Sequence, residues 1–186
     1  AVSIRRWWFW RRRFVGKLVM IEFKRIFNNV FRGWFQLKRC FPKPLLTEIG
    51  DAIGAGEAKH IGEVRFAIES RLSFAEVLAG VNSRGRAEQI FAQQGVWDTE
   101  HNSGILFYLL LSEHRIEIVA DRGVSRYVEQ ARWDAICQRM CSQFALGNWR
   151  EGSLAGIAEA HEILGEYLSD PNVPNPNELP NKPIIL

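Results

Sequence analysis

The sequence predicts an α/β protein, a three-layer α/β/α sandwich built on a small mixed sheet. Residues 104–111 form the most apolar run of the chain, and a strand that is apolar on both faces needs a layer of structure on each side. Residues 61–69 alternate as a strand does, with Val64, Phe66 and Ile68 on one face and charged residues on the other. Amphipathic helical patterns separate and follow these strands.

Each remaining element has a local signal. Thr47 begins a sequence that resembles a capping box and opens a helix over 45–57 with an apolar inner face. Residues 112–115 are short enough to turn the chain from the central strand into an antiparallel strand at 116–120. The other helices expected span residues 83–95, 126–145 and 149–168, and Gly95 ends the first of them.

Charge divides the chain into a basic leader and an acidic body. Residues 1–43 contain twelve Lys and Arg and one acid, 12 − 1 = +11, whereas the rest contains 12 bases and 20 acids, 12 − 20 = −8. A segment with this charge favours anionic partners such as lipid headgroups, nucleic acid or an acidic protein surface. We therefore divide the chain into a basic aromatic amphipathic arm (1–43), a compact domain (44–168) and a Pro-rich tail (169–186).

The arm has the composition of a helix that lies at a membrane interface. Bulky apolar residues recur along it at helical spacing, with Arg and Lys between them. Two other interpretations stay open: packing of the arm on its own domain, and binding of single-stranded nucleic acid through interleaved aromatic and basic side chains. We rank membrane contact highest because Trp, Phe and Arg together are the composition of an interfacial helix, and nucleic acid lowest because nothing in the sequence resembles a recognised RNA- or DNA-binding module. The residues expected to contact a membrane or a partner are Arg5, Arg6, Trp7, Trp8, Trp10, Arg11, Arg12, Arg13, Phe14, Lys17, Phe23, Phe27, Phe31 and Trp34.

Cysteine spacing and hydropathy limit the cellular compartments in which the protein is expected. Cys40, Cys137 and Cys141 have no metal-ligand or redox spacing and indicate reduced, structural thiols in a reducing compartment. The chain has no run of 18 apolar residues, and charges interrupt the apolar core that a signal peptide needs. The tail from Pro171 contains five of the seven prolines, so we expect an extended segment that is mobile alone and becomes ordered along a partner.

Four segments resemble the TPM domain family. They are GEVRFAIE, FAxxGVWDTEHNSGILFYLLL, IEIVADRG and FALGNWREGSLAGI, and the similarity covers roughly residues 44–168. The sequence KRCFP, from Lys38 to Pro42, stands where the bacterial subgroup without a secretion signal has a basic segment leading into the domain.

The resemblance implies a three-layer α/β/α domain that faces or attaches to a membrane and assembles, maintains or modulates membrane-protein complexes. Some members bind calcium or another divalent ion at the loops where strands end, and weak acid-phosphatase activity is attributed to plant members. Metal-binding members carry an acidic residue immediately before the turn glycine motif. This chain has Asn102-Ser103-Gly104 there, and a neutral amide is a poorer ligand for a hard cation than a carboxylate.

Two polar turns flank the buried strands, and such turns are where an α/β protein builds a ligand site. If the turns lie side by side, Asp98, Glu100 and Asp121 with the carbonyl of Asn102 form a weak oxygen-ligand site for calcium or magnesium. The alternative is structural: Asp98 and Thr99 cap a turn, and Asn102 adopts a left-handed conformation.

The sequence assigns no catalytic residue. His101 and His114 are expected to be exposed turn residues, since no phosphate-binding loop or phosphatase nucleophile motif accompanies them. We therefore predict a non-enzymatic interaction module that requires no cofactor. It binds, assembles or stabilises a membrane-protein complex, peripherally, at the cytoplasmic face of a bacterial inner membrane. The alternatives are a weak divalent-metal-dependent acid phosphatase and, third, nucleic-acid binding through the arm.

Overall fold

The computed structural model describes residues 33–169 and 175–186. The predicted membrane contacts of the arm lie outside these residues, apart from Trp34, whose backbone belongs to helix α2 (Gly33–Cys40). These contacts therefore stay predictions. Among the described residues, none of the helices is long and apolar enough to cross a bilayer.

The described residues form one four-stranded sheet in the order β3-β2-β1-β4. The central β1 pairs in parallel with both β2 and β4, and β2 pairs antiparallel with β3. The predicted small mixed sheet is confirmed, including the antiparallel pair. The strands are β1 (Glu63–Glu69), β2 (Gly104–Leu110), β3 (Arg115–Ala120) and β4 (Ile184–Ile185).

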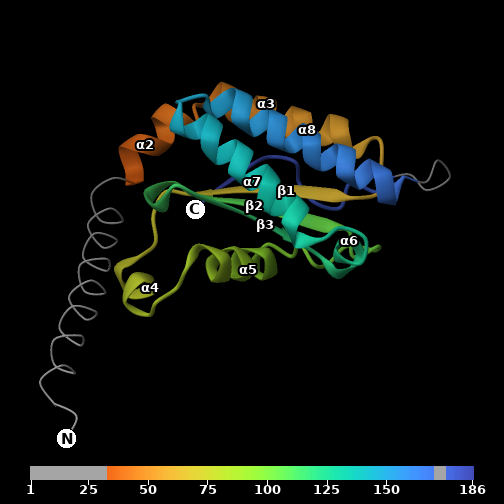
Figure 1. Ribbon diagram of the computed structural model, residues 1–186, viewed down its shortest axis with the longest axis horizontal. Helices are drawn as coiled ribbons and strands as arrows, with labels where there is room; N and C mark the ends of the chain where they lie inside the picture. The colour runs from red at the N-terminus through yellow and green to blue at the C-terminus, as the bar shows by residue number, and fades with distance from the viewer. Residues whose placement is uncertain (1–32, 170–174) are drawn as a thin grey trace, which may run out of the picture.

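Helices cover both faces of this sheet. Figure 1 shows α3, α7 and α8 on one side and α4 and α5 on the other, which confirms the three-layer sandwich. Chain order explains the arrangement, because α4 and α5 make the crossover between the parallel strands β1 and β2. The helices are α3 (Lys43–Glu57), α4 (Phe74–Leu78), α5 (Ser83–Gln93), α6 (Arg122–Ser125), α7 (Gln130–Ala145) and α8 (Trp149–Leu168), with a 3₁₀ turn, η1 (Leu111–Glu113), between β2 and β3.

The sheet separates two apolar cores. On one side Val64, Phe66 and Ile68 of β1 pack with α3, α7 and α8, as their alternation predicted. On the other side Ala67 packs with residues of β2, α4 and α5. Every residue of β2 is buried, so the expectation of a strand covered on both faces is confirmed.

Some boundaries differ from the sequence expectation for local reasons. Helix α3 starts at Lys43, two residues early, because Pro42 occupies the N-cap in an extended conformation; Thr47 is not a cap but donates to the Lys43 carbonyl one turn back. The helix expected from 126 begins at Gln130, because Asp121 caps the separate short helix α6. Helix α4 was not expected, and a capping box between Ser73 and Glu76 starts it.

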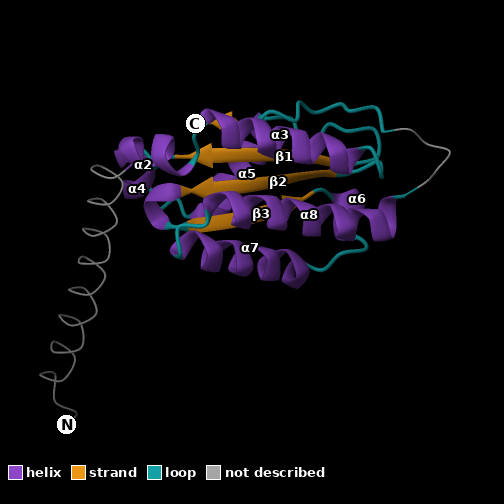
Figure 2. Cartoon of the chain, turned by 90° about the horizontal axis from the view of Figure 1, so that it is seen from above, coloured by secondary structure: helices purple, strands orange, loops and turns teal. Residues whose placement is uncertain are grey.

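The junction of α2 and α3 is part of the core. The Phe41 ring is buried and lies 5.7 Å from the Trp149 ring, 6.1 Å from Phe144 and 6.4 Å from Phe66, measured between centroids. This aromatic cluster fixes α2 against the start of α8 and the end of α7. Figure 2, a view from above, places α2 at one end of the sheet.

Candidate functional site

The two polar turns predicted as a ligand site do lie side by side. The Asp121 amide donates to the Gly104 carbonyl and the Gly123 amide donates to the Asn102 carbonyl, both at 2.9 Å. A side chain at Gly123 would place its Cβ 2.5 Å from the Asn102 and His101 carbonyl oxygens, so only glycine permits this approach. The turns thus bring Asn102 and Asp121 together.

Arg122 occupies the space between these two side chains. Its Nε donates to Asn102 Oδ1 at 2.8 Å, and its backbone amide donates to Asp121 Oδ1 at 2.7 Å. The second oxygen, Asp121 Oδ2, is buried without a hydrogen-bond partner. Asn102 has φ +51°, as the structural interpretation of this turn predicted, and Thr99 Oγ1 accepts from the Ser103 amide. A guanidinium group therefore holds the amide oxygen that was expected to bind a cation.

The other predicted ligands do not complete a metal site. Asp98 and Glu100 are exposed, and no three His, Cys, Asp or Glu side chains of residues 33–169 and 175–186 are grouped to hold an ion. Calcium takes six to eight oxygen ligands, whereas Arg122 holds the Asn102 amide oxygen and the exposed Asp98 and Glu100 belong to no such group among the described residues. This arrangement does not fit a bound divalent ion, so we derive no step through a metal. His101 and His114 are exposed, as expected.

The end of the molecule that carries α2, which we call the α2 end, exposes large apolar side chains. It includes α4, the connection between α7 and α8, and the last residue, Leu186 (Figures 1 and 2). Hydrogen bonds at this end join the C-terminus and η1 to the end of β1 and the residue after it: the Leu186 amide donates to the Ile68 carbonyl and the Ser112 amide donates to the Ser70 carbonyl. The exposed fractions are 57% for Phe74, 64% for Leu78, 75% for Leu146, 42% for Ile185 and 37% for Leu186.

An apolar cavity of about 280 Å³ lies beneath the same end. The ends of β2 and α7, η1 and the start of α8 line it, and Trp149 forms part of the wall. Cys141 also lines the cavity, and burial raises the pKa of its thiol. The α2 end is thus apolar on its surface and loosely packed below it.

The opposite end, which we call the turn end, is polar with isolated aromatics. It contains the two turns, α6 and the last turn of α8 (Figure 1). Tyr127 and Tyr167 stack there with centroids 6.0 Å apart, and Arg132 lies over the Tyr167 ring while it pairs with Glu166. Trp97 is also exposed. Aromatic and charged groups alternate at this end, so it lacks a continuous apolar surface.

A buried polar network between α3 and α8 was not anticipated from the sequence. His60 Nδ1 accepts from the Gly62 amide, so the neutral ring carries its proton on Nε2 and donates it to His161 Nδ1 at 2.8 Å. His161 then carries a proton on Nε2, which is buried and unpaired. Burial lowers the pKa of both histidines to about 4. Burial also raises the pKa of the nearby Glu57 to about 8, although the Val64 amide donates to its carboxyl group.

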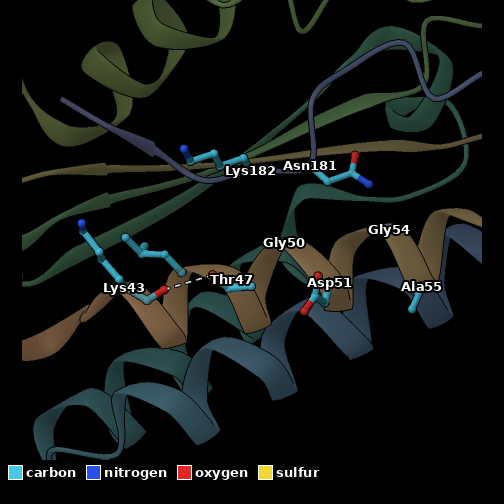
Figure 3. Close-up of a pocket in the computed structure, with 9 residues that line it drawn as sticks. Lys43, Thr47, Gly50, Asp51, Gly54, Ala55, Asn181 and Lys182 are labelled. Carbon is cyan, nitrogen blue, oxygen red and sulfur yellow. Dashed lines mark hydrogen bonds between the residues drawn. The ribbon is translucent and has the colours of Figure 1, made fainter.

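A groove with a volume of about 830 Å³ runs between α3 and residues 181–182. Figure 3 shows Gly50 and Gly54 on the α3 side, with Asn181 and Lys182 opposite them. The two glycines leave the helix without side chains there, so the facing segment approaches its backbone closely. No signal in the sequence pointed to this groove, because its two walls are far apart along the chain.

Comparisons with known proteins identify the family. The family model described as the TPM domain matches residues 43–163, more than half of the chain. No curated protein matches the chain. The BA42 protein from the psychrophilic bacterium Bizionia argentinensis has a similar structure, with a TM-score of 0.66 and 25% identity over 77% of this chain and 93% of that one. The N-terminal domain of a P. gingivalis protein is similar in fold, with a TM-score of 0.56 and 20% identity over 68% of this chain and 77% of that one. The chain belongs to the TPM domain family.

Proposed function

We propose that this protein is a non-enzymatic interaction module that attaches by its α2 end to an anionic membrane surface and presents its TPM domain to a membrane-protein complex. The observation that carries this proposal is the cluster of exposed large apolar side chains at the α2 end. The turn end then faces away from the lipid and is available to a protein partner. The cytoplasmic face of a bacterial inner membrane, expected from the sequence, is part of the proposal.

The exposed side chains suit shallow insertion between lipid headgroups. Phe74 and Leu78 are four residues apart on α4, so they lie on one face of the helix. Full burial of a side chain of this size contributes roughly 1.5–3 kcal/mol. Several partly inserted residues therefore give reversible binding, which is the range expected of a peripheral protein.

Charge supports the same orientation. Residues 1–43 carry +11 and include α2, whose last turn contains the basic residues Lys38 and Arg39. Each Lys or Arg near an anionic leaflet contributes about 1 kcal/mol, and this attraction falls within a Debye length. The remaining residues carry −8, so electrostatics alone turns the acidic body away from the lipid.

Vesicle co-sedimentation tests the proposal. We expect the full chain to sediment with vesicles of phosphatidylglycerol and phosphatidylcholine and to bind pure phosphatidylcholine vesicles much more weakly. The double substitution Phe74→Glu and Leu78→Glu should weaken binding at least tenfold, which is about 1.4 kcal/mol. The control, Trp97→Glu and Tyr127→Glu, changes two equally exposed aromatics at the turn end and should bind as the native protein does. Equal loss in both variants, or none in the first, would overturn the proposed orientation.

The metal-dependent phosphatase and nucleic-acid interpretations stay predictions from the sequence. No residue arrangement described above favours either of them over the membrane-associated module. A chromogenic phosphate assay of native protein and Asp121→Ala tests the first, and salt-dependent binding of DNA or RNA tests the second.

A further inference from the structure

Residues 175–186, which we call the strap, lie along the outer edge of β1. Asn175 Nδ2 donates to three backbone carbonyls between α3 and β1, those of Glu57, His60 and Gly62, at 2.9–3.2 Å. At its other end the strap forms β4, where Ile184 lies opposite Ala67 and Ile185 opposite Ile68. The strap thus holds β1 from one end to the other, as an added strand does in peptide recognition.

Two buried charged side chains of β1 bind the main chain of the strap. Glu63 is fully buried, and its carboxylate accepts from the backbone amides of Glu178 and Leu179 at 3.1 and 3.2 Å. Arg65 is 6% exposed, and its guanidinium donates to the carbonyls of Pro180 and Lys182. Hydrogen bonds to backbone groups are the same for any extended chain, so these contacts recognise a backbone conformation.

Side-chain contacts add the sequence requirement. Leu179 is 6% exposed and packs into the core beneath the α4 and α5 face, and Ile184 packs against the same core. An occupant of this edge therefore needs an amide side chain, an apolar residue four positions later and an aliphatic residue five positions after that. Asn175, Leu179 and Ile184 meet this spacing.

The fit between strap and domain is incomplete. Arg65 Nε and Asn181 Oδ1 are buried without hydrogen-bond partners, and the groove of about 830 Å³ lies between α3 and the strap (Figure 3). The regular pairing is only two residues long. Detachment of the strap therefore breaks a short strand and a few hydrogen bonds while the two main cores keep most of their residues.

We propose that the edge formed by β1 and α3 is a binding site for an extended segment, and that its occupant in trans is the strap of a second copy of this chain. The second copy is the partner because its strap meets the backbone contacts and the side-chain spacing without change. Exchange in both directions is closed and self-complementary, so it gives a symmetric dimer. At low concentration the strap binds its own domain, because the chain connection gives it a high effective concentration.

Exchange of the strap between two copies also affects lipid binding, a consequence that rests on the proposed function. A dimer carries two arms and two α2 ends, so attachment of one increases the effective concentration of the other at the lipid surface. Vesicle binding should then become steeper with protein concentration. This consequence fails if the membrane proposal fails, whereas exchange itself does not depend on lipid.

Disulfide trapping between two singly substituted proteins tests exchange without lipid. Ala67 and Ile184 lie opposite each other in adjacent parallel strands and face the same core, and neighbouring strands are about 4.8 Å apart, within disulfide range. We would mix a tagged Ala67→Cys protein with an untagged Ile184→Cys protein and oxidise the mixture mildly. Exchange predicts a covalent heterodimer on a non-reducing gel, and its yield should rise at least fivefold when the total concentration rises tenfold.

The control replaces Ile184→Cys with Asn177→Cys, an exposed strap position outside the β1–β4 strand pairing. It should give at least tenfold less heterodimer, and it also reports cross-linking through Cys141. The double variant Ala67→Cys and Ile184→Cys shows that the pair can form a disulfide, because its own strap forms an intrachain bond at low concentration. Intrachain bonds in the double variant without heterodimer in the mixture, or equal heterodimer with the Asn177→Cys control, would overturn the proposal.

Discussion

At the scale of residues, the contact between Gly56 and His161 holds α3 against α8. A Cβ at Gly56 would overlap the imidazole ring of His161, so the two helices pack this closely only because residue 56 has no side chain. We expect Gly56→Ala to lower the free energy of unfolding by about 1–3 kcal/mol, since the ring has to move within a packed interface. Denaturant unfolding measures this. Gly165→Ala on α8 is the matched control, because its Cβ meets nothing closer than Ser169 Oγ at 3.8 Å. Equal stability of the two variants would contradict this packing.

Glu57 predicts a pH dependence of stability. Burial raises its pKa in the folded state to about 8, from an ordinary value near 4.5, so the folded protein binds a proton that the unfolded chain has released between these pH values. Its stabilising effect is complete below pH 4.5 and is lost as the pH rises to 8, with a slope of at most about 1.4 kcal/mol per pH unit. Glu57→Gln removes the titrating carboxyl group but keeps an acceptor for the Val64 amide. The difference in free energy of unfolding between native and variant should therefore fall from pH 5 to pH 8. A difference that is constant or rises with pH would contradict the raised pKa.

The histidine pair acts in the opposite direction. The pKa values of His60 and His161 are lowered to about 4 by burial, so the unfolded chain binds more protons than the folded protein between pH 4 and 6.5. Their contribution to stability thus appears above pH 6.5 and is lost as the pH falls through 4. Together with Glu57, these groups favour a maximum of stability near pH 6.5. No sequence pattern revealed this network, because His60 and His161 are 101 residues apart.

Arg122 decides whether the two turns have access to a cation. Its Nε holds Asn102 Oδ1, and a divalent ion at that oxygen would have to displace the guanidinium. We expect Arg122→Ala to bind calcium more tightly than the native protein in a calorimetric titration, because it frees the amide oxygen beside Asp121 Oδ2. Arg126→Ala, which removes an exposed charge from the other end of α6, should titrate as the native protein does. Identical heats of binding for the native protein and both variants would show that Arg122 does not compete with calcium. No heat from any of the three proteins at millimolar ion would rule out the predicted calcium site.

At the scale of elements, the sequence predicted those parts whose signals are local. Helix α8 has the bounds that its apolar pattern gave, and β2 and β3 follow from a continuous apolar run and a short turn. The burial of the polar face of β1 was missed, because Glu63 and Arg65 bind backbone groups of the strap more than 100 residues away. Backbone amides and carbonyls are common to all residues, so the sequence does not show which of them a buried side chain will bind. The strand β4 was missed for the same reason.

The α2–α3 junction gives a prediction at this scale. Phe41 joins α2 to β1, to the end of α7 and to the start of α8 through three aromatic contacts. Phe41→Ala should therefore lower the free energy of unfolding by about 3–5 kcal/mol, as expected for loss of a buried ring. Phe74→Ala, at an exposed phenylalanine, should change it by less than about 0.5 kcal/mol. Similar values for the two variants in urea unfolding would show that α2 is not anchored by this cluster.

At the scale of the whole molecule, the two ends differ in chemistry. The α2 end carries the exposed apolar side chains and continues into the basic arm, whereas the turn end carries the polar turns and the tyrosine stack. Charge counting on the sequence predicted the division between a basic leader and an acidic body. It did not predict the apolar end, because α4, the connection between α7 and α8 and the C-terminus lie at one end only in the folded chain.

The orientation of the molecule on lipid is the most direct test of this account. A fluorophore attached at Leu78→Cys or at Tyr127→Cys, each in a Cys141→Ser background, reports how close the α2 end and the turn end come to a bilayer that contains a spin-labelled lipid quencher. If the α2 end faces the lipid, quenching should be strong at position 78 and almost absent at position 127, on vesicles that contain phosphatidylglycerol. Equal quenching at both positions, or stronger quenching at 127, would contradict it.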